Sequence, residues 1–330
     1  MKHVLVIRLS ALGDVAIVQP VLRAWAAANP DVRFTVAAPP LLEPLFAGTD
    51  NIDFLGVDKK QSAASIYRQL RGVGADAVAD LHQINRVGRA LLLLRLDALT
   101  HLRLPFPVCR LRKGCLTRML MLMHLRHRPR RPQHERYADV FRRLGLTAPA
   151  TGQPSSTIRR HSPTRPPLTV GIAPFAQHAG KIWPLENSAR LALMLAEGGY
   201  RVLLFGSRQE AAQLEAIAAA HDNITSLAGR HTFAEELDLI HSLDLMVSMD
   251  SANMHFASAL GTPVVSIWGA THPDFGFYGY GQDRSNALCA NLPCQPCSSY
   301  GQRPCRYGDH RCLHAIAPEQ VIQKIEEALR

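Results

Sequence analysis

The stretch from Leu245 to Trp268 constrains the fold of this chain more than any other. It opens with the apolar run Leu245–Ser248 and closes with the apolar run Val264–Trp268, and both have the composition of buried strands. Between them, Asp250 precedes a helical pattern that ends at Gly261. Strand, helix and strand in this order form a βαβ unit of a parallel sheet. The stretch therefore predicts an α/β protein whose ligands bind at the carboxyl ends of its strands.

The start of this helix is suited to a phosphate group. Free backbone N–H groups and the positive end of the helix dipole meet there. His255 lies within the first turns, where it can face the same crevice. An ordinary connecting helix with a capped end and a core histidine explains the same residues equally well. The pattern alone leaves both interpretations open.

Strand and helix patterns alternate along most of the chain. They begin with an apolar strand at residues 3–9 and stop near residue 147, where Pro, Ser, Thr and Arg become dominant. A second α/β series starts at residue 168, and within it Thr232 and Glu235 have the spacing of a capping box. We predict two α/β domains, residues 1–150 and 169–330, joined by a linker at residues 151–168.

The charge of the chain is uneven. The net charge is +10, and residues 101–136 contain ten Lys or Arg and one acid, Glu135. Such a segment suits an acidic substrate or an anionic membrane surface. We expect no nucleic acid as a partner, because no zinc finger, helix-turn-helix or RNA-binding signature accompanies it. The first residues lack the pattern of a signal peptide and no apolar run reaches about 18 residues, so we expect a cytoplasmic protein.

Two other segments leave alternatives open. The apolar run Cys115–Leu125 can lie on a membrane surface or cover a lipid-like acceptor, although a Met/Leu run of this kind is more often core. Near the end, Cys294, Cys297, Cys305 and Cys312 include one C-x2-C pair, which is compatible with zinc. The other two cysteines lack the usual short spacing, so we expect a structured loop and no metal site.

Three charged residues follow or precede predicted elements at positions where ligands bind in α/β sheets. Asp14 opens a helix, Lys181 lies in a loop after a strand, and Glu210 follows the next strand. Each also has an ordinary explanation. Asp14 can serve the helix dipole, Lys181 can be a solvated surface charge, and Glu210 can be a first-turn acid.

Three separated motifs resemble those of the lipopolysaccharide heptosyltransferases, glycosyltransferase family 9. They are R-L-S-A-L-G-D-V at residues 8–15, G-K-I-W-P at residues 180–184, and D-S-A-N-M-H at residues 250–255, with Ala252 where the family usually has glycine. The resemblance implies a GT-B fold, in which two Rossmann-like domains face each other across a cleft. The first domain would bind the acceptor and the second the nucleotide sugar.

The resemblance also implies roles for individual residues. Asp14 would act as general base, and Lys181 would contact the pyrophosphate and stabilise the charge on the leaving group. The other donor-binding residues would be Glu210 at the ribose, His231 at the adenine, and Asp250, Ser251, Ala252, Asn253 and His255 around the diphosphate. The acceptor-binding residues would be Ser10 and Gly13 of the first motif, together with basic residues of the 101–136 segment that would meet acceptor carboxylates and phosphates, namely Arg110, Arg112, Lys113 and Arg118.

These expectations lead to one functional hypothesis. The protein would be an inverting glycosyltransferase that moves heptose from ADP-heptose to a Kdo or heptose hydroxyl of the lipopolysaccharide inner core. It would need no cofactor or metal, and it would work in the cytoplasm, in peripheral contact with the inner membrane. The alternatives are a GT-B enzyme that uses a different nucleotide sugar for another cell-surface glycan, and a non-catalytic protein that binds sugar nucleotides.

Overall fold

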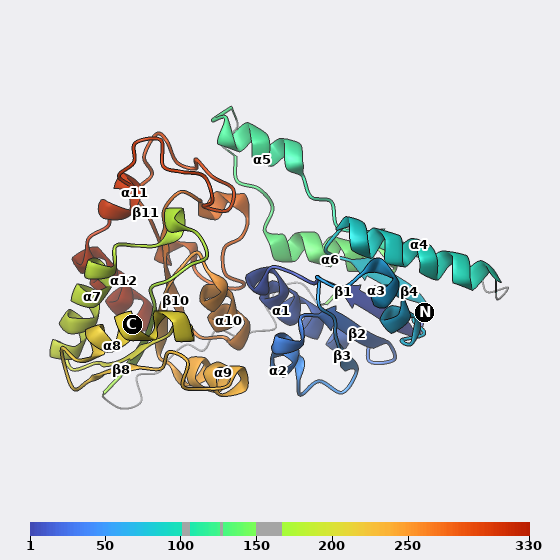
Figure 1. Ribbon diagram of the computed structural model, residues 1–330, viewed down its shortest axis with the longest axis horizontal. Helices are drawn as coiled ribbons and strands as arrows, with labels where there is room; N and C mark the ends of the chain where they lie inside the picture. The colour runs from blue at the N-terminus through green and yellow to red at the C-terminus, as the bar shows by residue number, and fades with distance from the viewer. Residues whose placement is uncertain (101–105, 126–127, 150–166) are drawn as a thin grey trace. The chain divides into compact units, whose positions relative to one another are not determined.

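The computed structural model describes residues 1–100, 106–125, 128–149 and 167–330 (Figure 1). Contacts divide the chain into two compact units. The first comprises Met1–Lys113 and Gln133–Ser155, and the second comprises Gly114–Pro132 and Ser156–Arg330. The sequence placed all of residues 1–150 in the first domain, whereas the contacts group residues 114–132 with the second unit. Residues 151–166 of the predicted linker lie outside the described residues.

The first unit is built on a five-stranded parallel sheet with the order β3-β2-β1-β4-β5. Its strands are β1 (His3–Ile7), β2 (Arg33–Ala38), β3 (Ile52–Gly56), β4 (Ala77–Asp80) and β5 (Val108–Arg110). Its helices are α1 (Leu12–Ala28), α2 (Glu43–Phe46), α3 (Ala63–Arg71), α4 (Asn85–Thr100) and α6 (Gln133–Arg143), with a 3-10 turn at Pro40–Leu42.

The apolar composition of β1 explains its central place in this sheet. Its residues from Val4 to Ile7 are fully buried, as expected for a strand covered by helices on both faces. On one side, Phe141 of α6 packs against Trp25 of α1 at a ring-centroid distance of 5.5 Å. Because α6 packs on α1, the chain returns to the first unit after the excursion of residues 114–132.

The second unit contains a six-stranded parallel sheet with the order β11-β10-β9-β6-β7-β8. Its strands are β6 (Thr169–Ala173), β7 (Arg201–Leu204), β8 (Ile224–Ser226), β9 (Leu245–Met249), β10 (Val264–Trp268) and β11 (Ala287–Cys289). Its helices are α5 (Cys115–Leu122), α7 (Leu185–Glu197), α8 (Ala211–Ala218), α9 (Phe233–Ser242), α10 (Ala252–Leu260), α11 (Arg311–His314) and α12 (Pro318–Leu329). Short 3-10 turns lie at Ala179–Lys181, Arg208–Glu210, Pro273–Phe275 and Arg284–Asn286.

The βαβ unit predicted from the central stretch is confirmed as β9, α10 and β10. Gly261 ends α10 with a φ of 79°, the left-handed conformation that glycine adopts without strain. The start of α10 lacks the usual side-chain cap. Ser251 is the N-cap residue but makes no capping hydrogen bond, and its Oγ lies 3.1 Å from Oγ of Ser248 instead. The capping box of Thr232 and Glu235 at the start of α9 is confirmed.

The segment around α5 is a surface helix, so the interpretation of Cys115–Leu125 as core is wrong. Met121 is its one buried residue within α5, whereas Leu116, Met119, Met123 and Leu125 are at least half exposed. In the part of the chain that the structure describes, no helix is both long and apolar enough to cross a bilayer.

Candidate functional site

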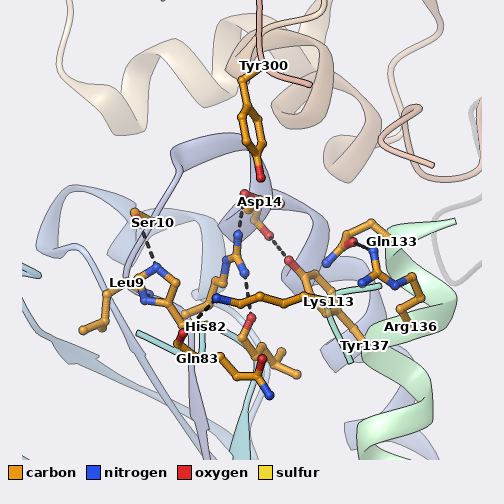
Figure 2. A network of polar contacts seen from close by, with 12 residues as sticks. Leu9, Ser10, Asp14, His82, Gln83, Lys113, Gln133, Arg136, Tyr137 and Tyr300 are labelled. Atoms are coloured by element: carbon orange, nitrogen blue, oxygen red, sulfur yellow. Dashed lines mark hydrogen bonds and ion pairs between the residues drawn. The ribbon is translucent and has the colours of Figure 1, made fainter. Parts of the chain in front are cut away.

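The first half of the candidate site lies at the carboxyl ends of β1 and β4, in the first unit (Figure 2). Asp14 occupies the first turn of α1, and Arg8 directly follows β1. Nη2 of Arg8 pairs with Oδ2 of Asp14, and both side chains are largely buried. Nη1 of Arg8 donates to the carbonyl of Leu81 at 2.6 Å. Arg8 therefore links the carboxylate of Asp14 to the end of β4.

One carboxylate oxygen of Asp14 has no hydrogen-bond partner in the part of the chain that the structure describes. Oδ1 is buried and has no hydrogen-bond partner among the described residues. The Tyr137 hydroxyl donates to the main-chain carbonyl of Asp14 at 3.3 Å, so it holds the backbone of this residue and leaves Oδ1 unoccupied. Burial raises the pKa of Tyr137 far above its ordinary value, which keeps the hydroxyl protonated. A carboxylate that is fixed at one oxygen and has no hydrogen-bond partner at the other can accept a proton.

Ser10 is held by a residue that sequence reasoning missed. Nδ1 of His82 lies 3.3 Å from the backbone nitrogen of Leu9, and Nε2 of His82 lies 2.9 Å from Oγ of Ser10 (Figure 2). Burial, together with the positive charges of Arg8 and Lys113, lowers the pKa of His82 to about 3. The imidazole is therefore neutral. Because Nδ1 accepts from Leu9, the proton is on Nε2 and is donated to Ser10, whose own hydroxyl hydrogen is left for a ligand.

The basic residues predicted at the acceptor are distributed over both units. Lys113 donates to the carbonyl of Gln83 at 2.8 Å, and Arg110 lies 3.6 Å from Asp80, so both adjoin the end of β4. Gly13 is buried in the first turn of α1, beside Asp14. The side chain of Arg112 is exposed at the surface of the first unit.

Arg118 lies apart from this group, on α5 in the second unit. Its guanidinium hydrogen-bonds the hydroxyl of Tyr300 and stands 5.2 Å from the centroid of that ring.

The second half of the candidate site lies at the carboxyl edge of the second sheet. Nζ of Lys181 lies 2.8 Å from Oδ2 of Asp250 and 3.1 Å from its main-chain oxygen. Oδ2 of Asp250 also accepts a hydrogen bond of 2.7 Å from the buried hydroxyl of Thr271. Thr271 was not expected from the sequence, since a single threonine after a strand carries no recognisable signal. Together these contacts fix the ammonium group of Lys181 beside the start of α10.

Gly301 supports the same lysine from the other side. It has a φ of 80°, and a Cβ built on it would lie 2.6 Å from Cγ of Lys181. Only a residue without a side chain allows this approach, so the loop packs closely on the stem of Lys181. The sequence predicted only a structured loop in this cysteine-rich segment.

That loop contains Cys294, Cys297, Cys305 and Cys312, which line one small cavity. All four are free thiols. Across the ranges that the structure describes, no group of three or more His, Cys, Asp or Glu side chains is placed to hold a metal ion.

Four of the predicted donor-binding residues follow four neighbouring strands. The strands lie in the order β9-β6-β7-β8, and all are parallel. The residues that follow them, in the same order, are Asp250, Lys181, Glu210 and His231. Since the carboxyl ends of parallel strands share one edge, the loops that carry these four residues start in a row along it.

Two members of this row have local contacts as well. The carboxylate of Glu210 accepts from the backbone N–H of Ser207 at 2.6 Å, which is the first-turn role that the sequence left as an alternative. Nδ1 of His231 lies 3.9 Å from a carboxylate oxygen of Glu235 and is partly exposed. His255 is buried within α10. Ala252 and Asn253 form the first turn of α10, whose first N–H groups have no partner within the helix.

Comparison with known proteins places this arrangement in a family. The family model of glycosyltransferase family 9 (heptosyltransferase) matches residues 118–307. Lipopolysaccharide heptosyltransferase 2 of Escherichia coli K12 is 34% identical over 189 residues, which are 54% of this chain and 51% of that protein. The chain thus spans about half the length of the curated relatives it matches.

Solved structures match the whole chain in fold. The structure of E. coli ADP-heptose lipopolysaccharide heptosyltransferase II gives a TM-score of 0.68 at 24% identity and covers 100% of this chain and 98% of its own. E. coli heptosyltransferase WaaC with ADP-2-deoxy-2-fluoro heptose gives 0.68 at 19% identity, with coverage of 99% of both chains. These likenesses confirm the predicted α/β class and GT-B fold. Because the family model matches more than half of the sequence, the chain belongs to glycosyltransferase family 9, the heptosyltransferase family.

Proposed function

We propose that this protein is an inverting glycosyltransferase that transfers heptose from ADP-heptose to a Kdo or heptose hydroxyl of the lipopolysaccharide inner core. The observation that carries the proposal is the row of Asp250, Lys181, Glu210 and His231 along one edge of the second sheet. A nucleoside diphosphate bound along this edge would first contact the ammonium of Lys181 and the start of α10. It would then contact the carboxylate of Glu210 and, last, the imidazole of His231. These groups suit a diphosphate, a ribose and an adenine in that order.

Lys181 and α10 provide positive charge where the leaving group forms. When the bond between the sugar and the diphosphate breaks, negative charge grows on the departing ADP. The ammonium of Lys181, held by Asp250, and the first N–H groups of α10 can stabilise that charge without reorganising. We therefore propose a reaction that needs no metal ion.

Asp14 is the proposed general base. Its Oδ1 would take the proton of the acceptor hydroxyl while the acceptor oxygen bonds to the anomeric carbon and ADP departs from the opposite face. Arg8 and Tyr137 would keep the carboxylate in place during this step. Ser10 would offer its hydroxyl hydrogen to the same acceptor.

We also propose that the protein works at the cytoplasmic face of the inner membrane. On α5 and directly after it, Leu116, Met119, Met123 and Leu125 are exposed, and Arg128 is an exposed cation nearby in sequence. Apolar side chains flanked by basic ones are typical of helices that lie on anionic membranes. The acceptor of the proposed reaction is a glycolipid, so contact with its membrane would bring enzyme and acceptor together.

The deciding experiment combines the purified protein with ADP-heptose and Kdo2-lipid A, and follows the product by mass spectrometry. We expect one heptose to be added. Asp14→Asn should slow transfer by about 10²- to 10⁴-fold, the usual contribution of a general base, with ADP affinity unchanged. Asp31→Asn, at an exposed acid of the same unit, is the matched control. If the protein binds UDP or GDP but not ADP, the proposed donor is wrong.

A further inference from the structure

The cysteine-rich loop of the second unit brings four thiols to one place. Cys294, Cys297, Cys305 and Cys312 line one cavity of about 10 Å³, close to the space that a single water molecule needs. Because the cavity is so small, the four side chains surround nearly the same point. Burial and the charges of the other three thiolates raise the pKa of Cys312 to about 11, as expected for sulfur atoms that lie close together. The proposed transfer reaction uses none of these thiols.

Cys305 is the thiol best prepared to react with an oxidant. Its side chain is partly exposed. Burial raises the pKa of this thiol, but hydrogen bonds from the backbone N–H groups of residues 307–310 outweigh that effect, so the pKa lies below its usual value. Three arginines and His310 line the same cavity, and none of the described residues that line it is acidic. Backbone N–H groups and basic surroundings favour the thiolate, which is the reactive form of cysteine.

Cys297 has the opposite character. Burial, together with the charges of Cys294 and Cys305, raises the pKa of its thiol. Its Sγ lies 3.8 Å from the carbonyl oxygen of Ala270, to which the thiol donates. Cys297 is therefore a protonated thiol that shares a cavity with a thiolate. A reactive thiolate beside a second thiol is the arrangement in which a reversible disulfide forms.

The backbone of Cys297 is joined to the residues that hold Lys181. The N–H groups of Cys297 and Ser298 each donate to the carbonyl of Ala270 at 3.0 Å. The N–H of Ala270 donates in turn to the carbonyl of Gly180 at 2.7 Å, one residue before Lys181. A displacement of Cys297 therefore reaches the turn that carries this lysine.

Gly301 provides a second connection, because it lies midway between Cys297 and Cys305. Its N–H donates to Oγ of Ser298 at 3.0 Å, and its Cα packs so closely on Lys181 that no side chain fits at this position. A bond between the two cysteines would close a loop of nine residues with Gly301 at its centre. A change in the path of that loop would therefore move the glycine relative to the stem of Lys181.

We propose that Cys297 and Cys305 form a redox switch, in which a disulfide between them displaces Lys181 and weakens nucleotide binding. The oxidant is a hydroperoxide. The Cys305 thiolate attacks one peroxide oxygen, the O–O bond breaks, and water or an alcohol leaves with the proton of the attacked oxygen, so that Cys305 becomes a sulfenate. Sγ of Cys297 then attacks this sulfur, the S–O bond breaks, and the sulfenate oxygen leaves as hydroxide with the proton of Cys297. Two thiols are oxidised, one hydroperoxide is reduced, and a dithiol reverses the change.

The test uses the purified protein and ADP, so the effect on the nucleotide rests on the proposed function, whereas the disulfide does not. The reduced wild type is treated with a small excess of hydrogen peroxide, digested without reductant and mapped by mass spectrometry. We expect a link between Cys297 and Cys305, a rise in the ADP dissociation constant of at least about fivefold by calorimetry, and recovery after dithiothreitol. Cys297→Ser and Cys305→Ser should bind ADP like the reduced wild type and keep that affinity in peroxide. Cys109→Ser, at a free cysteine in β5 of the first unit, is the matched control and should respond like the wild type.

Hydrogen exchange separates the switch from the proposed donor. Without any nucleotide, oxidation should speed the exchange of the N–H groups of Lys181 and Ile182, which bond within the 3-10 turn at Ala179–Lys181. If the reduced protein ignores ADP but this exchange still rises, the switch stands and the proposed donor fails. If peroxide leaves the two thiols unlinked, or if the disulfide changes neither the exchange nor the ADP affinity, the switch is overturned and the proposed function is untouched. A metal ion held by these thiols in the untreated protein, detected by elemental analysis, would also overturn the switch.

Discussion

At the scale of single residues, the contact that most defines the second half-site is the one between Thr271 and Asp250. The threonine hydroxyl and the ammonium of Lys181 share one carboxylate oxygen, at 2.7 and 2.8 Å. Without the hydroxyl, that oxygen keeps one donor, and the carboxylate can turn away from the position in which it holds Lys181.

We expect Thr271→Val to weaken ADP binding by about tenfold or more, because a hydrogen bond to a charged group contributes about 1.5–3 kcal/mol. Valine has nearly the same shape, so the buried site stays filled. Calorimetric titration with ADP measures the effect, and Thr271→Ser should restore most of the affinity because it keeps the hydroxyl. Equal affinities in Thr271→Val and the wild type would show that the threonine does not position Lys181.

A second prediction at the scale of single residues concerns the stability of the fold at low pH. The pKa of His82 falls from 6.5 to about 3 on folding, so the unfolded chain binds a proton between these values that the folded chain excludes. The stability that His82 confers is therefore complete above pH 6.5 and is lost as the pH falls toward 3. Between pH 7 and pH 5 the loss should be about 2 kcal/mol.

Urea unfolding of the wild type and His82→Asn at these two pH values tests this expectation. The variant should be less stable at pH 7 but should lose less stability on acidification, by about 2 kcal/mol. His314→Asn, at an exposed histidine, is the control and should follow the wild type. If His82→Asn loses as much stability as the wild type on acidification, a group other than His82 takes up the proton that destabilises the fold.

At the scale of helices and strands, the sequence correctly predicted those features that depend only on residues close together in the chain. The strands and helix of residues 245–268 and the capping box at Thr232 were predicted, because composition and capping act within a few positions. The partners in the candidate site could not be predicted in this way. Thr271 is 21 residues from Asp250, and His82 is 72 residues from Ser10. Only the sheet brings them together, so no local pattern signals these contacts.

The excursion of residues 114–132 was missed for a related reason. The apolar run of this segment has the composition of a buried segment, yet α5 exposes one of its faces. We expect the combined variant Leu116→Gln, Met119→Gln and Met123→Gln to bind vesicles containing phosphatidylglycerol at least about tenfold more weakly, since three apolar side chains would no longer be buried in lipid. Co-sedimentation measures this, and Leu41→Gln, at another exposed leucine, should have no effect. Unchanged binding by the triple variant would remove α5 from the membrane contact.

At the scale of the whole molecule, the proposed roles separate by unit. The residues proposed for the diphosphate, ribose and adenine lie in the second unit, and the proposed base lies in the first. Each unit has its own sheet and its own carboxyl edge. A substitution in one unit should therefore alter the binding of one substrate and leave the other unaffected.

A crossed pair of lysine variants tests this separation. Lys181→Ala should weaken ADP binding by at least about tenfold, because it removes the cation beside the diphosphate. Lys113→Ala, which removes an expected acceptor-binding residue and its hydrogen bond to the Gln83 carbonyl, should instead raise the acceptor KM and leave the ADP affinity as it is. Each loss in kcat/KM can be converted to a free energy of activation. In the double variant the two free energies should add to within about 0.5 kcal/mol, as they do for sites that have no interacting residue in common. Calorimetry with ADP and initial rates at varied acceptor concentration give both quantities. A loss of ADP affinity in Lys113→Ala as large as that in Lys181→Ala would mean that the two units do not divide the substrates between them.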